Sequence, residues 1–465
     1  MSHGFKILTW VIFIAAIALR FFLFLSNPPE NSFDDHFSPV YLMMQSGKIP
    51  PKNACLECIQ PPIFYGISAM VGELVLKMGI NKIYLPKILQ FLCFLYGSLQ
   101  LGIIYLILNK IKLSPFSKAI AFTTVCFLPQ HIYISAMHSN DTLSYLLAAI
   151  CIYLLLIVIE RNLSLVWSGT LSIAVTAALF TKYFAFALIP TIIIIYIIIL
   201  SCKVIVPAKK VLSSMAITLL LPVCLLGWNT IYNISIYNTA MPSNASTFNP
   251  ALTQPHAKSL SFTTFKPWVA MDKQILCPEL LDSFWTLLYS KTWFDVEPKF
   301  LYFTDPDNQW WYHYYCWIRG EEPFPGKNNP FSSFTRFSGF WLIALGIFPF
   351  LVSVMGFLRI LFGKWGLETK SSSIEMVKMQ IFPVLLIWNL VCVIAFVLKY
   401  PVFSAIKASY LLISLPAFAV FLGVGLMACE RYATIKKIIG VFFIPLFILV
   451  TLHILHIVQS AWGQP

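Results

Sequence analysis

The chain has 465 residues, of which 58% are hydrophobic and only 11% are charged, and its mean hydropathy is +0.78. A water-soluble domain carries about 25% charged residues, so this composition excludes a soluble globular protein and predicts an all-α polytopic membrane protein. The formal net charge is +13. In a soluble protein that excess would suggest nucleic-acid binding, so the positions of the basic residues must decide what it means.

Apolar runs long enough to cross a bilayer, which takes about 20 residues, recur along the chain. The first, Phe5 to Leu25, has no small-residue cleavage site after it, so we predict an uncleaved anchor. Residues 63–78 are interrupted by glycines and charges, which favours an interfacial helix. The remaining predicted spans bring the total to about 11 and cover residues 87–108, 117–136, 142–159, 165–181, 183–201, 211–232, 336–358, 379–399, 405–428 and 437–458.

Lysine and arginine gather in alternate loops, as expected where cytoplasmic loops are the basic ones. If the N-terminus with Lys6 is cytoplasmic, the cytoplasmic loops hold Lys110, Lys112 and Lys118; Arg161; Lys203, Lys209 and Lys210; Arg359, Lys364, Lys370 and Lys378; and Arg431, Lys436 and Lys437. The exceptions are Lys77, Lys82 and Lys87 before the second span. The net charge is therefore read as a topology signal, and nucleic acid is not expected as a partner.

This topology divides the chain into three parts. Residues 1–232 form an N-terminal transmembrane module whose first outer loop covers 26–86, residues 233–335 form an extracytoplasmic or lumenal segment, and residues 336–465 hold the C-terminal transmembrane helices. The middle part, a mixed outer segment before the eighth span, is rich in Trp and Tyr. We expect it to lie on the membrane surface and cover the first loop.

The first outer loop carries two adjacent carboxylates, Asp34 and Asp35, followed by His36. Adjacent carboxylates hinder each other's ionisation, and a positioned carboxylate can take a proton from a reacting hydroxyl. The alternative is that the pair only caps a helix over 36–45.

Other polar residues fall at the outer ends of predicted helices. Gln60 opens a Gln-Pro-Pro-Ile-Phe-Tyr run that ends at Tyr65, and proline is common at a helix start. Asn140 and Asp141 begin the fourth span, where an N-cap or a glycosylation sequon are the alternatives. Cations at this level suit a lipid phosphate, although interfacial snorkelling explains each one singly; they are Arg20, Lys182 and Lys407, the last followed by Tyr410.

Four cysteines lie in predicted outer loops, namely Cys55, Cys58, Cys277 and Cys316. In an oxidising compartment disulfides are favoured over a metal site, and the pairing is left open between 55–58 with 277–316 and cross-loop bridges. The chain has no H-E-x-x-H or similar metal motif. We therefore favour metal-independent chemistry with no cofactor, without excluding a divalent metal.

The order of these motifs resembles the GT-C superfamily of membrane glycosyltransferases, in particular the group of protein O-mannosyltransferases and lipid A aminoarabinose transferases. The resemblance rests on Phe33-Asp34-Asp35, on Gln60-Pro61-Pro62-Ile63-Phe64-Tyr65, on Asn140-Asp141 and on the stretch from Lys407 to Pro416. This chain departs from the group in having Asp as the second acid and Gln60 where a basic residue often stands.

The resemblance implies a hexosyl- or pentosyltransferase that uses a polyprenyl-phosphate (for example dolichyl-phosphate) sugar on the outer or lumenal face. Asp34 would be the base, and Asp35 would position the acceptor or share the role of base. Arg20, Lys182 or Lys407 would hold the donor phosphate. The acceptor would be a lipid, glycan or protein, in a bacterial inner membrane or an endoplasmic reticulum membrane. The alternatives are a flippase or transporter of lipid-linked saccharides and a non-catalytic subunit of a glycan-assembly complex.

Overall fold

The computed structural model describes residues 3–29, 31, 34–201, 206–240, 242, 261–265, 283–294, 333–363, 373–399, 406–430 and 432–462. Its elements are helical. The N-terminal half holds α1 (His3–Ser26), α2 (Phe37–Ser46), η1 (Leu56–Ile59), α3 (Ile63–Lys77), η2 (Lys82–Tyr84), α4 (Leu85–Lys110), α5 (Pro115–Cys126), α6 (Pro129–Ser135), α7 (Asn140–Glu160), α8 (Leu165–Leu179), η3 (Tyr183–Ala187), α9 (Leu188–Ser201) and α10 (Ala208–Tyr237). The rest holds α12 (Phe284–Trp293), α15 (Ser333–Leu361), α16 (Ser373–Lys399), η8 (Ala408–Ser414), α17 (Leu415–Cys429) and α18 (Ala433–Trp462).

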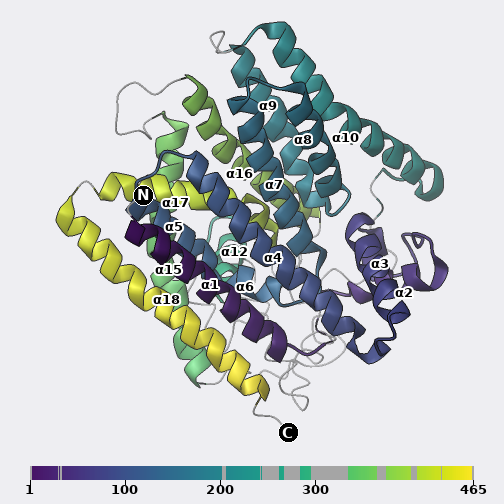
Figure 1. Ribbon diagram of the computed structural model, residues 1–465, viewed down its shortest axis with the longest axis horizontal. Helices are drawn as coiled ribbons and strands as arrows, with labels where there is room; N and C mark the ends of the chain where they lie inside the picture. The colour runs from purple at the N-terminus through teal and green to yellow at the C-terminus, as the bar shows by residue number, and fades with distance from the viewer. Residues whose placement is uncertain are drawn as a thin grey trace.

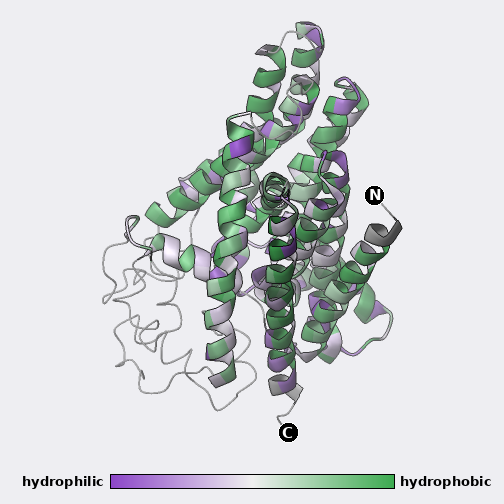
Figure 2. Cartoon of the chain, turned by 90° about the vertical axis from the view of Figure 1, so that its left-hand side faces the viewer, coloured by the Kyte–Doolittle hydropathy of each residue, from purple (hydrophilic) through white to green (hydrophobic). Residues whose placement is uncertain are grey.

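Within these ranges, 9 helical stretches are long and apolar enough to cross a membrane. Apolar residues cover the lengths of the helices in Figure 2, and the chain is a multi-pass integral membrane protein. This confirms the predicted all-α polytopic class. Two of the 11 expected spans are shorter: 165–181 forms the 15-residue α8, and 117–136 is divided between α5 and α6.

The division between α5 and α6 has a local cause. Pro129 opens α6, and a proline disfavours the helical conformation in the residue before it. Leu128 accordingly has an extended backbone with φ −72° and ψ 114°. After this break, α6 ends at Ser135, and a short polar connection leads into α7.

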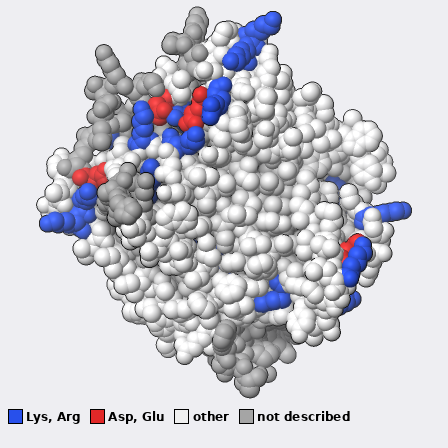
Figure 3. Space-filling model, viewed as in Figure 1, with Lys and Arg blue, Asp and Glu red and all other residues white. Residues whose placement is uncertain are grey.

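The bundle has two polar ends, and shared contacts fix which helix termini meet at each. Glu160 at the end of α7 pairs with Lys110 at the end of α4 at 2.5 Å and with Lys378 near the start of α16 at 3.5 Å. The opposite termini of α4 and α7 meet where Cys93 Sγ lies 3.6 Å from the carbonyl of Ser139. In Figure 3 the charged side chains gather toward two edges of the face in view, with a wide uncharged belt between them. We call the end that holds Ser139 the site end.

At the site end, α2 packs against α3, and α3 packs against α4 (Figure 1). Their buried side chains form a small core of their own, which includes Phe64 and Tyr65. The helix expected over 63–78 is therefore present as α3, beside the bundle. Helix α12, which belongs to the segment predicted to lie on the membrane surface, instead packs inside the bundle against α6, α15 and η8; most of 233–335 lies outside the described residues.

Candidate active site

Two lysines from distant parts of the chain flank one aromatic stack at the site end. Lys182 immediately precedes η3 and Lys407 immediately precedes η8, and both side chains are buried. The Lys182 and Lys407 ammonium groups lie 5.3 Å and 5.9 Å from the centre of the Tyr410 ring. That ring stacks on Phe184 with centroids 4.0 Å apart. Cations near an aromatic face are attracted to its electron density, so the stack helps to hold both charges together.

Each lysine has its own carboxylate. Lys182 Nζ lies 2.6 Å from Asp141 Oδ1 and donates to Asn140 Oδ1 at 3.1 Å, while Lys407 Nζ lies 2.5 Å from Asp34 Oδ2. The two pairs differ in access, because the Asp34 side chain is 28% exposed and that of Asp141 only 1%. Asp34 is therefore the carboxylate of the two that a substrate hydroxyl can reach, whereas Asp141 keeps a buried cation in place.

Asp35 faces another way. Its carboxylate accepts from the Ser38 hydroxyl at 2.8 Å and from the Ser38 amide at 3.4 Å, in the first turn of α2. Asp35 is exposed. A carboxylate that satisfies the free amides of a helix start is an ordinary cap, so the helix-cap alternative raised for the acidic pair describes Asp35, and Asp34 is the member that joins the lysines.

A polar chain leads from the first loop to the Asp141–Lys182 pair. His36 Nδ1 lies 2.9 Å from the Tyr65 hydroxyl, and His36 Nε2 lies 3.4 Å from Ser139 Oγ. Ser139 Oγ donates to Asp141 Oδ2 at 3.2 Å. Because the single Ser139 proton is used on Asp141, His36 must donate from Nε2 and accept at Nδ1 from Tyr65.

Burial fixes the protonation of His36 and Tyr65 in this series of hydrogen-bonded side chains. Burial lowers the pKa of His36 well below 6.5, with Asp34 opposing that change, so the imidazole is neutral at pH 7. Burial, with neighbouring carboxylates, raises the pKa of Tyr65 well above 10, so its hydroxyl keeps its proton. Asn140 Nδ2 also reaches the Tyr65 hydroxyl, at 3.5 Å, which ties α7 to α3.

Sequence reasoning missed Glu57, which the structure brings to the same site. Cys55 and Cys58 form a disulfide, and the loop that it closes contains Leu56 and Glu57, the first two residues of η1. Glu57 is 9% exposed, and its Oε2 lies 3.9 Å from His36 Nδ1. Burial raises the pKa of Glu57 to about 7, with Asp34 adding to the rise and Lys407 and Lys182 opposing it. An acidic residue between two cysteines is the available signal, but the C-x-x-C spacing by itself indicates only a disulfide or a metal motif.

Gln60 follows η1, and its side-chain Oε1 is buried with no hydrogen-bond partner among the described residues. Nearby, the Tyr183 hydroxyl donates to the carbonyl of Ile59 at 3.2 Å and lies 3.3 Å from Lys52 Nζ. These contacts tie the loop that follows α2 to η3, which carries the Lys182 side of the site.

Arg20 lies in a separate network. Its guanidinium donates to the carbonyls of Ala16 and Cys126 at 3.0 Å and 2.8 Å and lies 2.7 Å from His131 Nδ1. His131 in turn contacts Gln100 at 2.8 Å. Arg20 is fully buried where α1 crosses α5 and α6, so the structure does not bring it to Lys182 and Lys407. The predicted cysteines Cys277 and Cys316 lie outside the described residues.

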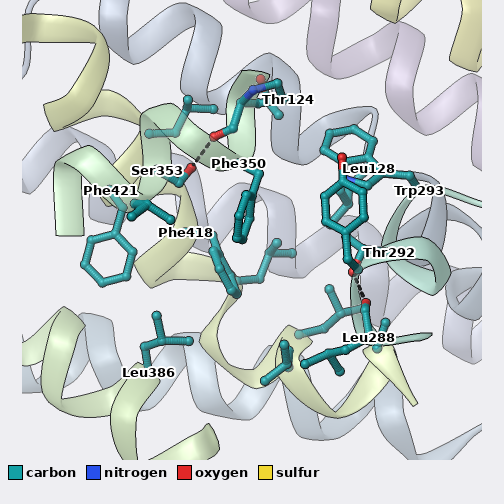
Figure 4. Close-up of a pocket in the computed structure, with 18 of the residues that line it drawn as sticks. Thr124, Leu128, Leu288, Thr292, Trp293, Phe350, Ser353, Leu386, Phe418 and Phe421 are labelled. Atoms are coloured by element: carbon teal, nitrogen blue, oxygen red, sulfur yellow. Dashed lines mark hydrogen bonds between the residues drawn. The ribbon is translucent and has the colours of Figure 1, made fainter. Parts of the chain in front are cut away.

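An apolar cavity of about 470 Å³ has Ala408, the residue that follows Lys407, in its lining. It is lined from η8 by Ala408, Leu411 and Leu412, and by side chains of α5, α12, α15, α16 and α17. Figure 4 shows the Phe350 and Phe418 rings within it, facing the side of α12 that carries Leu288 and Thr292. Another buried lysine, Lys291 of α12, donates to the carbonyl of Ile406 at 2.8 Å. The sequence did not indicate a role for Lys291 in the site, because its segment was expected to lie on the membrane surface.

The fold matches solved structures, although no protein-family model and no curated protein matches the chain. The oligosaccharyltransferase of Archaeoglobus fulgidus in its apo form superposes with a TM-score of 0.54 at 13% identity, over 98% of this chain and 57% of that enzyme. Its complex with zinc and sulfate gives 0.53 at 13% identity, over 95% and 53%. ArnT of Cupriavidus metallidurans with undecaprenyl phosphate gives 0.37 at 14% identity, over 93% and 79%.

The chain has the GT-C fold. This confirms the predicted fold class, and the chain spans a little over half the length of the archaeal enzyme. In the described part of the chain, no group of three or more His, Cys, Asp or Glu side chains is arranged to hold a metal ion. Instead, the amines of Lys182 and Lys407 occupy the carboxylates of Asp141 and Asp34.

Proposed function

We propose that this protein is an integral-membrane glycosyltransferase that moves a sugar from a polyprenyl-phosphate-linked donor to a lipid, glycan or protein acceptor. One observation carries the proposal. Two lysine–carboxylate pairs with buried lysines, Lys182–Asp141 and Lys407–Asp34, flank the Tyr410 ring, and Ala408, the residue after Lys407, lines an apolar cavity. A donor that joins a phosphate to a long hydrocarbon chain needs both features at once.

The lysines supply the phosphate end of the donor site. Lys182 and Lys407 share the Tyr410 ring, so a phosphate between them meets two positive charges in a desolvated setting, where charge-assisted hydrogen bonds are strong. The residue after Lys407, Ala408, lines the cavity. A prenyl chain leaving the phosphate would therefore enter apolar surroundings immediately. The archaeal oligosaccharyltransferase of the same fold was solved with sulfate, an anion of comparable geometry.

Asp34 is proposed as the base of a single inverting displacement. As the acceptor oxygen bonds to the anomeric carbon, its proton passes to Asp34 and the bond from that carbon to the phosphate oxygen breaks. The electron pair leaves with the phosphate, whose new charge the two lysines stabilise. The 28% exposure of the Asp34 side chain, against 1% for Asp141, supports this choice. Asp35 would position the loop through its cap on α2.

The remaining binding residues follow from their places around this centre. His36, Tyr65 and Asn140 would hold the first loop against α7 through the polar chain described above. Gln60, whose buried side-chain oxygen has no hydrogen-bond partner among the described residues, is proposed to contact a sugar hydroxyl. Arg20 is proposed to act from a distance, by holding α1 against α5 and α6 rather than by touching the phosphate.

We also propose that transfer needs no metal ion. Positive charge at the leaving phosphate comes from Lys182 and Lys407, and their pairing with Asp141 and Asp34 leaves these carboxylates neutralised without a divalent cation. The site would face the outer or lumenal side, because the opposite end of the bundle carries Lys110, Lys378 and their partner Glu160. Either a bacterial inner membrane or an endoplasmic reticulum membrane fits this orientation, with the N-terminus cytoplasmic.

Purified protein in lipid nanodiscs, supplied with radiolabelled polyprenyl-phosphate hexoses and pentoses, tests the proposal. We expect sugar transfer in the wild type, its loss in Asp34→Asn and its retention in Asp35→Asn. Transbilayer movement of the donor without transfer would instead establish a flippase. A third outcome is that the protein shows no transfer and no transbilayer movement, while cells that carry Asp34→Asn still assemble the glycan. That result would establish a non-catalytic subunit.

A further inference from the structure

Glu57 is turned into the site by a covalently closed turn. The Cys55–Cys58 disulfide brings the two Cα atoms to 5.1 Å, and both cysteines are buried. Two residues lie inside this loop. Leu56 is 46% exposed and points away, whereas Glu57 is 9% exposed and lies 3.9 Å from His36 Nδ1. The disulfide-closed turn therefore restrains the position of the Glu57 carboxyl group.

The charge state of Glu57 changes the balance of positive and negative charge among the groups around it. From the elements packed around it, the neutral titratable groups are His36, Tyr65 and Tyr410, and the charged groups are Asp34, Asp141, Lys182 and Lys407. The two aspartates offset the two lysines. An ionised Glu57 is thus an excess negative charge that interacts electrostatically with the two cations assigned to the donor phosphate, and a protonated Glu57 leaves that balance unchanged. Since burial raises the pKa of Glu57 to about 7, both forms are populated near neutral pH.

We propose that Glu57 is a positioning residue that sets, through its charge, the balance between donor binding and acceptor activation, and that the Cys55–Cys58 disulfide holds it in the site. This inference rests on the proposed function. Protonated Glu57 adds no negative charge that competes with the phosphate for Lys182 and Lys407. Ionised Glu57 competes for both lysines, which loosens the hold of Lys407 on Asp34 and makes Asp34 a stronger base. Glu57 exchanges its proton only with solvent, so it adds no bond-making step to the transfer.

Two readouts test this, and a merely structural role would move neither. The first is binding of undecaprenyl phosphate to the protein in nanodiscs from about pH 5.5 to 8.5. The phosphate itself ionises near pH 6, but it does so equally for every variant, so differences between variants report on the protein. Across pH 7 we expect the wild type to lose about tenfold more affinity than Glu57→Gln, which is the effect of one pKa unit of coupling.

The second readout is the pH profile of transfer. For the wild type we expect both kcat and the donor KM to rise through about pH 7. Glu57→Gln should have a low donor KM across the range and, at pH 8, a kcat about tenfold below the wild type. Glu57→Asp should restore the pH dependence. Leu56→Ala, in the same disulfide loop but pointing outward, should match the wild type.

The double variant Cys55→Ser/Cys58→Ser tests the disulfide, with folding checked by thermal unfolding. It should shift the pH transition from about 7 toward the ordinary carboxyl value of 4.5, because the released Glu57 regains solvent. An unchanged transition would overturn the role of the disulfide. A wild-type profile in Glu57→Gln would overturn the role of Glu57. Absence of transfer with every sugar donor would defeat the proposed function, and the binding readout would still decide the inference.

Discussion

The buried pair Lys182–Asp141 gives the sharpest energetic prediction. The two side chains are 6% and 1% exposed, and their charged atoms lie 2.6 Å apart. Lys182→Met removes the cation but leaves the Asp141 carboxylate buried without its charge partner. Breaking a buried ion pair in this way costs about 3–5 kcal/mol of unfolding free energy, because the remaining charge keeps its full desolvation penalty.

The pair Lys77–Glu73 on α3 is the matched control. Its charged atoms lie 3.6 Å apart, and its side chains are 77% and 42% exposed. Lys77→Met should cost no more than about 0.5 kcal/mol, as for exposed helical pairs. Reversible unfolding in detergent micelles, followed by tryptophan fluorescence, measures both.

The double variant Lys182→Met/Asp141→Asn should recover most of the stability lost in Lys182→Met, since no isolated charge remains. A loss below about 1 kcal/mol in Lys182→Met, or no recovery in the double variant, would contradict the account of this pair.

Four further results are expected. Gly356→Ala should destabilise by about 1–3 kcal/mol or more, because its new Cβ would lie 1.8 Å from the Phe421 carbonyl oxygen, whereas Gly102→Ala, with open space, should be neutral or stabilising in the same unfolding assay. Arg20→Met should lower the melting temperature by leaving the Cys126 carbonyl and His131 without a donor, and leave the donor KM unchanged in the transfer assay. Because burial holds the pKa of His36 below 6.5, folding excludes a proton there, so the unfolding free energy should fall as pH drops below 6.5, and His36→Gln should reduce that slope in pH-dependent denaturation. EDTA should leave transfer unchanged, and a loss of activity that Mn²⁺ or Mg²⁺ restores would refute the proposed role of the lysines.

Much of the site could be predicted because the membrane topology determines which polar residues lie at the same end of the bundle. Once the basic loops define one side, Asp34, Asn140–Asp141, Lys182 and Lys407 must share the other, and the structure brings all of them together. Their pairing could not be predicted. Lys407 meets Asp34 across 373 positions of sequence, and which carboxylate serves which lysine depends on how η3 and η8 stack.

The positions of Arg20 and Glu57 could not be predicted without knowing which residues pack around them. Whether Arg20 snorkels or is buried depends on the Cys126 carbonyl of α5 and on His131 of α6, two helices that the chain separates just before Pro129. Glu57 is ordinary in sequence, and its direction comes from the closed turn that sends Leu56 outward. Local patterns determine which residues reach the outer end, while packing determines which of them touch.

The central claim is that Asp34, held by Lys407, activates the acceptor at a donor site built from two lysines. The most direct test is transfer from polyprenyl-phosphate sugars by Asp34→Asn in nanodiscs, with Asp34→Asn/Lys407→Met as the variant that leaves no isolated buried charge. Both variants should fold and bind undecaprenyl phosphate, the double variant more weakly, and both should lose transfer by at least about 100-fold, the lower range for a positioned acid–base group. Transfer within a few-fold of the wild type in either variant would contradict the central claim.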